Sequence, residues 1–414
     1  MADKKIDFTE FQKTDFDSWK NKVIADLKGK DYSILQFPTD EEIEIQAIIE
    51  PKIIDRNDPD IAPYTRGDKQ DNNDWVIFKS YEDTVTNADL LYDLNKGISG
   101  IDLTFDSYHH IDQLLENVEL EYIYSSFSVK TPDQACQLLE KLPGSANGWV
   151  NFNPIAKDSL VGIDEVLKYT IPRPTFKAFN IDGADIRNRG GNIIDEVAYL
   201  LSCGNEYLNH FRFTGIHTDL VTENILFTTG IGPNYFFEMA KIRAIRMLWA
   251  NIVDQYHPES SKAFKIHLHA KTMSLNLHDE DPYNNLLRQT TEAMSAAIGG
   301  VDSMEVVPYQ GKSADEKELF QRMAKNIQLI LKEESMINQV IDPAGGSYYI
   351  ELLTEEIAKR SWKKFQEMEA QGGYMEIYDD FMQGLVGKRT DYLSSIESGK
   401  RVQIGVNKYQ MVKA

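Results

Sequence analysis

Two short segments carry side chains that could bind a ligand or move a proton. In the first, His267, His269 and Lys271 alternate with apolar residues, so they share one face of a predicted strand. Two histidines on a strand face form a metal site only with a third His or carboxylate ligand, and none lies nearby in the sequence. We therefore expect no metal here, and either interior histidines with internal partners or contacts to a substrate.

The second segment reads Asp-Gly-Ala-Asp-Ile-Arg-Asn-Arg from residue 182 and follows another β-rich run. Arg187 could bind a carboxylate or phosphate through two parallel hydrogen bonds. A salt bridge from Arg187 or Arg189 to Asp182 or Asp185 is the simpler expectation. The sequence contains no GxGxxG, GxxxxGK[ST], GxSxG or HExxH motif, which argues against a nucleotide-binding loop, a serine hydrolase and a zinc protease.

Composition narrows the function classes further. The 414 residues include 65 Asp and Glu against 44 Lys and Arg, a formal charge of −21. Such a surface repels nucleic acid and anionic lipid, so we expect neither as a partner. Cys136 and Cys203 show no CxxC spacing, which is typical of buried reduced thiols. With no apolar signal segment or membrane-length apolar run, we expect a cytoplasmic protein.

The elements that must position these residues follow a regular rhythm of strand and helix. Eight β-rich runs are separated by helix-length segments, which favours a (β/α)8 TIM barrel within the α/β class, spanning residues 71–320, over an open sheet. In such a barrel, residues 182–189 lie at the catalytic rim, and the polar face of the seventh run lies in the lumen or at its rim. The eight runs are residues 75–80, 100–105, 122–129, 148–153, 176–181, 225–230, 264–269 and 303–308.

The barrel is flanked by two segments of different character. Residues 1–70 read as an extended N-terminal arm containing one amphipathic helix, with apolar residues at three- and four-residue spacing. Such a helix cannot bury its apolar face alone, so we expect its stripe to contact a partner. The stripe consists of Phe16, Trp19, Val23 and Leu27. Residues 321–414 read as a helical extension, with helices at 317–332 and 354–371 and a final arm.

Three long stretches, residues 232–250, 281–300 and 341–354, resemble the methylmalonyl-CoA mutase family. The sequences Pro-Tyr-Thr-Arg-Gly from residue 63 and Ile-Gly-Val-Asn-Lys-Tyr from residue 404 match in the same order. The substrate-binding domain of that family is a (β/α)8 barrel, in agreement with the strand count.

Departures from the family pattern identify the type of member that the chain resembles. The family's cobalamin-binding domain begins with D-x-H-x-x-G, whereas none of the eight histidines here has Asp two residues before it. Asp185 stands where the catalytic subunit has a His, and the tyrosine run after Arg66-Gly67 and the carboxylate-clamping Arg near 157–174 are missing. On the seventh strand, R-T-H-S-Q becomes His-Leu-His-Ala-Lys, which keeps only His269.

The resemblance therefore implies the small (beta, non-catalytic) subunit of a heterodimeric mutase, without a cobalamin-binding domain, a cofactor or catalytic residues of its own. The large catalytic subunit would hold adenosylcobalamin and interconvert methylmalonyl-CoA and succinyl-CoA. The arm would contact that subunit. His267, His269, Lys271, Asp185 and Arg187 would be remnants of a substrate site, in a lumen that we expect to be filled. The alternatives are the acyl-CoA-binding barrel of a split mutase and a catalytically dead acyl-CoA sensor.

Overall fold

The computed structural model describes residues 14–39, 43–48, 63–105, 110–153, 155 and 160–410, and the chain divides into two compact units, residues 1–57 and 58–414. In the first unit, α1 (Phe16–Asp26) begins at Asp15, whose carboxylate accepts a hydrogen bond from the Ser18 N–H at 2.8 Å. The predicted amphipathic helix is thus present, and its four stripe residues are half-buried. A short antiparallel pair, β1 (Phe37–Pro38) and β2 (Glu44–Ile45), follows.

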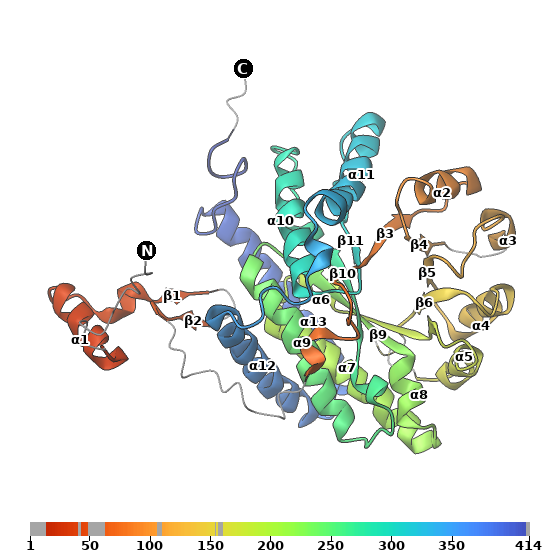
Figure 1. Cartoon of the computed structure of the whole chain (residues 1–414), viewed down its shortest axis with the longest axis horizontal. Coiled ribbons are helices and arrows are strands. Elements are labelled where there is room, and N and C mark those ends of the chain that lie inside the picture. The colour runs from red at the N-terminus through yellow and green to blue at the C-terminus, as the bar shows by residue number, and fades with distance from the viewer. Residues whose placement is uncertain are drawn as a thin grey trace, which may run out of the picture. The chain divides into compact units, whose positions relative to one another are not determined.

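The second unit is built on one parallel sheet of nine strands in the order β7-β6-β5-β4-β3-β11-β10-β9-β8. The fifth predicted run is a strand broken at Ala178, because β7 pairs with β6 and β8 pairs with β9. This division closes the ring, so the predicted (β/α)8 barrel is confirmed (Figure 1). The strands are β3 (Val76–Tyr81), β4 (Gly100–Thr104), β5 (Tyr124–Ser128), β6 (Asn147–Asn151), β7 (Phe176–Lys177), β8 (Phe179–Asp182), β9 (Ile225–Ile231), β10 (His267–Thr272) and β11 (Ser303–Glu305).

Helices surround the sheet, and side-chain caps start several of them. Thr86 and Asn192 form capping boxes at α2 and α7, and Thr131 caps α4, which has Pro132 in its first turn. The two long helices α7 and α9 are buried along most of their length. The helices are α2 (Asn87–Leu94), α3 (Ile111–Leu114), α4 (Pro132–Lys141), α5 (Ile163–Thr170), α6 (Gly183–Asn188), α7 (Ile193–Thr214), α8 (Thr218–Glu223), α9 (Tyr235–Asp254), α10 (Asn284–Gly299) and α11 (Ala314–Leu329).

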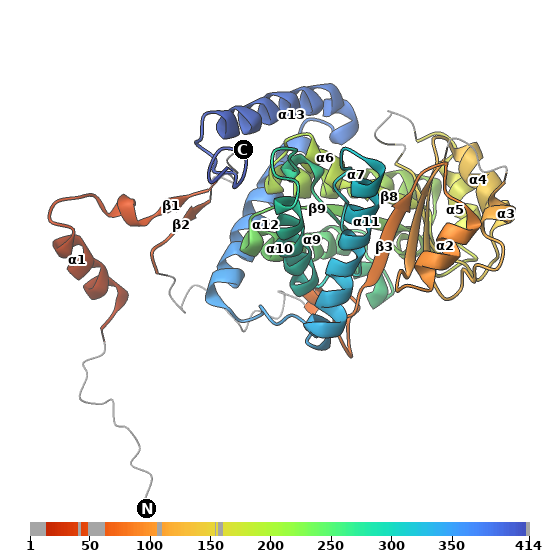
Figure 2. The same cartoon turned by 90° about the horizontal axis from the view of Figure 1, so that it is seen from above.

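Two further helices follow the barrel. The first, α12 (Tyr348–Glu369), packs on α9 and α7, and the second, α13 (Tyr374–Glu397), lies over α6 and α7 (Figure 2). Residues 374–397 lie in the predicted helical extension, and they form this helix although the sequence predicted helices there only at 317–332 and 354–371. Tyr374, Leu385 and Ile396 are the buried residues of α13, and Tyr378 and Phe381 stand between Tyr374 and Leu385 at three- and four-residue spacing, which is the apolar pattern of a helix. Among the described residues, no helix is long and apolar enough to cross a bilayer.

Candidate functional site in the barrel lumen

The lower part of the lumen is filled by large side chains. Phe78 of β3, Trp149 of β6 and Leu226 of β9 form one buried cluster, and Tyr124 of β5 packs against it. The ring centroids of Phe78 and Trp149 are 4.8 Å apart. A Cβ on Gly100 would lie 2.4 Å from the Phe78 ring, so glycine on the neighbouring strand provides the space that this ring occupies. These residues interdigitate as side chains do in the closed interior of a barrel.

Two histidines of β10 complete this filling. His269 is 1% exposed, and its ring centroid lies 4.9 Å from that of Phe78 and 5.3 Å from that of Trp149. His269 Nδ1 and His267 Nε2 each lie 2.9 Å from the hydroxyl of Ser303. Burial lowers the pKa of His267 to about 4 and that of His269 well below its ordinary value. Both imidazoles are therefore neutral near pH 7, and both have an internal partner.

The third predicted residue on this face, Lys271, lies above the histidines in a group of acids. Its Nζ is 3.0 Å from Asp102 Oδ2 and 3.0 Å from Glu305 Oε2. Burial alone would lower the pKa of Lys271, but these two carboxylates raise it above its ordinary value. Asp182 is close enough to interact with the same ammonium group, and burial raises its pKa to about 6. Three carboxyl groups thus surround one ammonium group.

A chain of polar side chains crosses the upper lumen from β4 to β9. The hydroxyls of Thr104 and Ser128 are 3.1 Å apart, and Asn151 Nδ2 donates to Ser128 Oγ at 3.1 Å. Asn180 Nδ2 donates to Asn151 Oδ1 at 3.0 Å and accepts at Oδ1 from the Thr228 hydroxyl at 2.8 Å. These side chains bind one another across five strands, so much of their hydrogen-bonding capacity is used inside the protein.

The other two predicted site residues lie apart from this group and from each other. Arg187 is 6% exposed and donates to Glu238 Oε1 and to the Gly191 carbonyl, each at 3.0 Å. The expected salt bridge within this segment forms between Arg189 and Asp185, whereas Arg187 contacts Glu238 of α9 across 51 positions of sequence. Asp185 is half-exposed and pairs with Arg189, 2.6 Å away.

Arg187 belongs to a buried charge network that the sequence did not reveal. Lys241 is fully buried between Glu196 Oε2 at 2.9 Å and Glu238 Oε2 at 2.5 Å. Glu196 also accepts from the Thr229 hydroxyl at 2.6 Å. Although burial raises the pKa of Glu196, the Lys241 and Arg187 cations oppose that rise. This part of the 232–250 stretch therefore has a structural role: it fixes the backbone that follows β9.

The other family-like stretches also meet one another through charges. Arg243 donates to both oxygens of Glu351, at 2.8 and 3.0 Å, and to Asp342. Arg66, before the barrel, lies 3.4 Å from the same Asp342 carboxylate. Residues 63–67, 232–250 and 341–354 are thus joined on the outside of the barrel by a single group of ion pairs.

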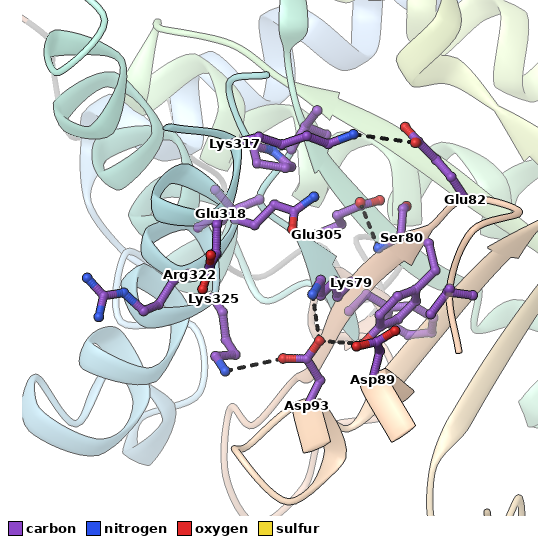
Figure 3. Close-up of a pocket in the computed structure, with 18 of the residues that line it drawn as sticks. Lys79, Ser80, Glu82, Asp89, Asp93, Glu305, Lys317, Glu318, Arg322 and Lys325 are labelled. Atoms are coloured by element: carbon purple, nitrogen blue, oxygen red, sulfur yellow. Dashed lines mark hydrogen bonds and ion pairs between the residues drawn. The ribbon is translucent and has the colours of Figure 1, made fainter. Parts of the chain in front are cut away.

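A separate side pocket of about 670 Å³ opens at the carboxyl end of β3, between α2 and α11 (Figure 3). Lys271 and Glu305 reach it from the lumen, while Lys79, Asp93 and Lys325 line its opposite side. Across the described ranges, no three His, Cys, Asp or Glu side chains are grouped so that they could hold a metal ion.

The fold and the closed lumen define a (β/α)8 barrel protein. Comparison with known proteins identifies the family to which it belongs. The family model described as methylmalonyl-CoA mutase matches residues 151–414. The methylmalonyl-CoA mutase small subunit of Porphyromonas gingivalis (strain ATCC BAA-308 / W83) is 32% identical over 97% of this chain and 71% of that protein. The chain therefore belongs to the methylmalonyl-CoA mutase family.

Two other relatives show how the likeness is distributed. The methylmalonyl-CoA mutase of Cereibacter sphaeroides is 29% identical over 96% of this chain and 65% of its own length. The large subunit from the same P. gingivalis strain is 33% identical over 61% of this chain and 36% of that protein. A solved 7,8-dihydropteroate synthase from Vibrio fischeri ES114 aligns at 13% identity over 63% of this chain and 93% of that one, with a TM-score of 0.33, too low to support any argument.

Proposed function

We propose that this chain is the non-catalytic small subunit of a heterodimeric, adenosylcobalamin-dependent methylmalonyl-CoA mutase, and that it supports a large subunit which interconverts methylmalonyl-CoA and succinyl-CoA. The observation that carries the proposal is the filled lumen. Phe78, Trp149 and His269 occupy the axis along which an acyl-CoA chain would have to pass. Naming within the family is consistent with this role, because one bacterium has relatives called small and large subunits.

The charged groups above the filled part of the lumen also disfavour binding of methylmalonyl-CoA to this chain. Methylmalonyl-CoA carries a free carboxylate next to its thioester, and the catalytic subunits resembled here bind it with Arg. In this chain the only cation among the described lumen residues near that level, Lys271, already has Asp102 and Glu305 as partners at 3.0 Å. A third carboxyl group, Asp182, adds repulsion once it is ionised.

The barrel lumen does not fit the cofactor that the family uses. His267 and His269 could not hold cobalt, because both lie inside the lumen against Ser303, and none of the eight histidines stands in the family's D-x-H-x-x-G signature. Asp185, at the position of the family's catalytic His, is turned to Arg189. We therefore assign adenosylcobalamin to the partner and no reaction step to this chain.

The test is a comparison of the chain alone with the chain co-expressed with a large subunit. Alone, with adenosylcobalamin and methylmalonyl-CoA, it should form no succinyl-CoA, and calorimetry should detect no saturable binding of either thioester. Co-expressed, it should co-purify with the large subunit. Turnover by the isolated chain would contradict the proposal. Micromolar binding that is lost in His269→Ala would instead support the acyl-CoA sensor.

A further inference from the structure

Two lysines on one wall of the side pocket at the carboxyl end of β3 share a single carboxylate. Lys79 Nζ lies 2.5 Å from Asp93 Oδ2, and Lys325 Nζ lies 3.4 Å from Asp93 Oδ1. Figure 3 shows both lysines, one from β3 and one from α11, directed at the same carboxylate. Two ammonium groups therefore share one carboxylate, and the Tyr81 hydroxyl donates to it as well, at 3.2 Å.

Solvent contributes little to the stabilisation of the two ammonium groups, because both lysines are largely buried. The side chains of Lys79, Lys325 and Asp93 are 24%, 11% and 10% exposed. A partly buried ammonium group without its own counterion is costly, and the longer Lys325 contact leaves that group with donors to spare.

Among the described residues, the other acids that line the pocket are not in ion-pair contact with Lys79 or Lys325, although Asp89 is close enough to interact with Lys79 electrostatically. Asp89, one turn earlier on α2, is exposed and accepts from the Thr86 hydroxyl at 2.6 Å and from its N–H at 3.0 Å. Glu82 pairs with Lys317 across the mouth of the pocket, at 3.4 Å. Glu305, on the far wall, lies against Lys271. Within the part of the chain that is described, Asp93 is the one carboxylate in ion-pair contact with Lys79 and Lys325.

The pocket beside this pair has room for a ligand and an apolar side. Its volume of about 670 Å³ lies in the range of small-molecule sites. Val306, Val307 and Pro308 line it after β11. A ligand with a negative head and a short apolar stem could therefore accept hydrogen bonds from the Lys325 ammonium group and cover these side chains at the same time.

We propose that this pocket binds a small organic anion, a carboxylate or phosphate monoester on a short apolar stem, with its charged head on Lys79 and Lys325. The site lies beside the filled lumen and uses neither the imidazoles nor the arm. The inference therefore stands or falls independently of the proposed subunit role.

Calorimetry with butyrate and butyl phosphate in low-chloride buffer tests the proposal, with butyramide and inorganic phosphate as probes that lack the charge or the stem. At least one of the two stemmed anions should bind with a dissociation constant of about 1 mM or below. Inorganic phosphate should bind more weakly than the better of them, and butyramide should not bind.

Variants locate the binding. Lys325→Met should weaken it by about tenfold, because a charge-assisted hydrogen bond is lost, while Lys325→Arg should retain most of it. Lys363→Met, on an exposed α12 side chain, is the matched control and should bind as the wild type does. Thermal unfolding of each variant without ligand establishes that it is folded. The proposal is overturned if neither stemmed anion binds saturably, or if folded Lys325→Met binds as tightly as Lys363→Met.

Discussion

The inside and the outside of the barrel differ in what they share with the catalytic members that the sequence resembles. Outside, Arg243, Glu351 and Asp342 lie in family-like stretches and hold one another in place. Inside, Trp149, Phe78 and the two histidines of β10 fill the space that a substrate would need. The contacts between family-like stretches thus lie outside the lumen, and large side chains fill the lumen itself.

This contrast explains why a strong family resemblance and the proposed loss of activity are compatible. The ion pairs outside the lumen fix how helices pack on the sheet, and such contacts are required whether or not the barrel is catalytic. If no ligand passes through the lumen, the side chains there do not have to leave space for one and can become larger. A filled lumen also adds buried apolar area, which stabilises the fold.

The largest expected effect comes from opening the lumen. Trp149→Ala should lower the free energy of unfolding by about 3–5 kcal/mol, because the cavity next to Phe78 and His269 cannot collapse within a closed ring of strands. Urea denaturation measures this change. Tyr122→Ala, at a side chain that is 79% exposed, is the control and should change stability by less than about 0.5 kcal/mol. A loss below about 1 kcal/mol for Trp149→Ala would mean that the lumen is not packed as described.

Removing the ion pairs of Arg243 outside the barrel should lower the free energy of unfolding slightly less. Arg243→Met keeps the length of the side chain but removes the cation that Asp342 and Glu351 share, and leaves Asp342 with only the exposed Arg66. We expect a loss of about 3 kcal/mol. The same urea experiment applies, with Arg322→Met, an exposed residue of α11, as the control. If the Arg243→Met protein is as stable as the Arg322→Met protein, the ion pairs of Arg243 do not contribute to the free energy of unfolding.

The interior histidines should make the stability of the folded chain depend on pH. The pKa of His267 is about 4 in the folded chain against 6.5 for an ordinary histidine. Between these values the unfolded chain binds the extra proton, so the stability from neutral His267 falls as the pH is lowered from about 6.5 to about 4. Asp182 has the opposite slope, because its pKa is raised from 3.8 to about 6.

The histidine contribution is therefore measured as a difference between proteins. Below about pH 6, His267→Gln should lose about 1 kcal/mol per pH unit less than the wild type does. His217→Gln, at an exposed histidine, should follow the wild-type curve. Parallel curves for His267→Gln and the wild type would show that His267 titrates normally in the folded chain.

The sequence predicted the strands well because each is a continuous β-rich run that needs no knowledge of its neighbours. The inward face of the seventh run was predictable from its alternation, but the break at Ala178 and the space beside Gly100 appear only in three dimensions. The acids around Lys271 were also hidden, because Asp102 lies 169 positions away among 65 acidic residues. Helix α13 was predictable, because Tyr374, Tyr378, Phe381 and Leu385 recur at three- and four-residue spacing, but no separate helix was assigned to this part of the helical extension.

The smallest effect on the barrel should come from its N-terminal arm. Residues 1–57 form a separate compact unit, so a chain lacking residues 1–35 should unfold in urea within about 0.5 kcal/mol of the full chain. In the proposed complex the same deletion should weaken association with the large subunit, because it removes Phe16, Trp19, Val23 and Leu27, four half-buried apolar side chains of α1.

Co-purification with a tagged large subunit measures that loss, and replacing the four apolar residues by Ser in the full-length chain provides the matched variant. If both proteins are retained on the large subunit as well as the wild type is, the stripe has another role. If the deletion instead destabilises the barrel, the arm belongs to the scaffold, and the boundary between structural and partner-binding residues must be drawn within the arm.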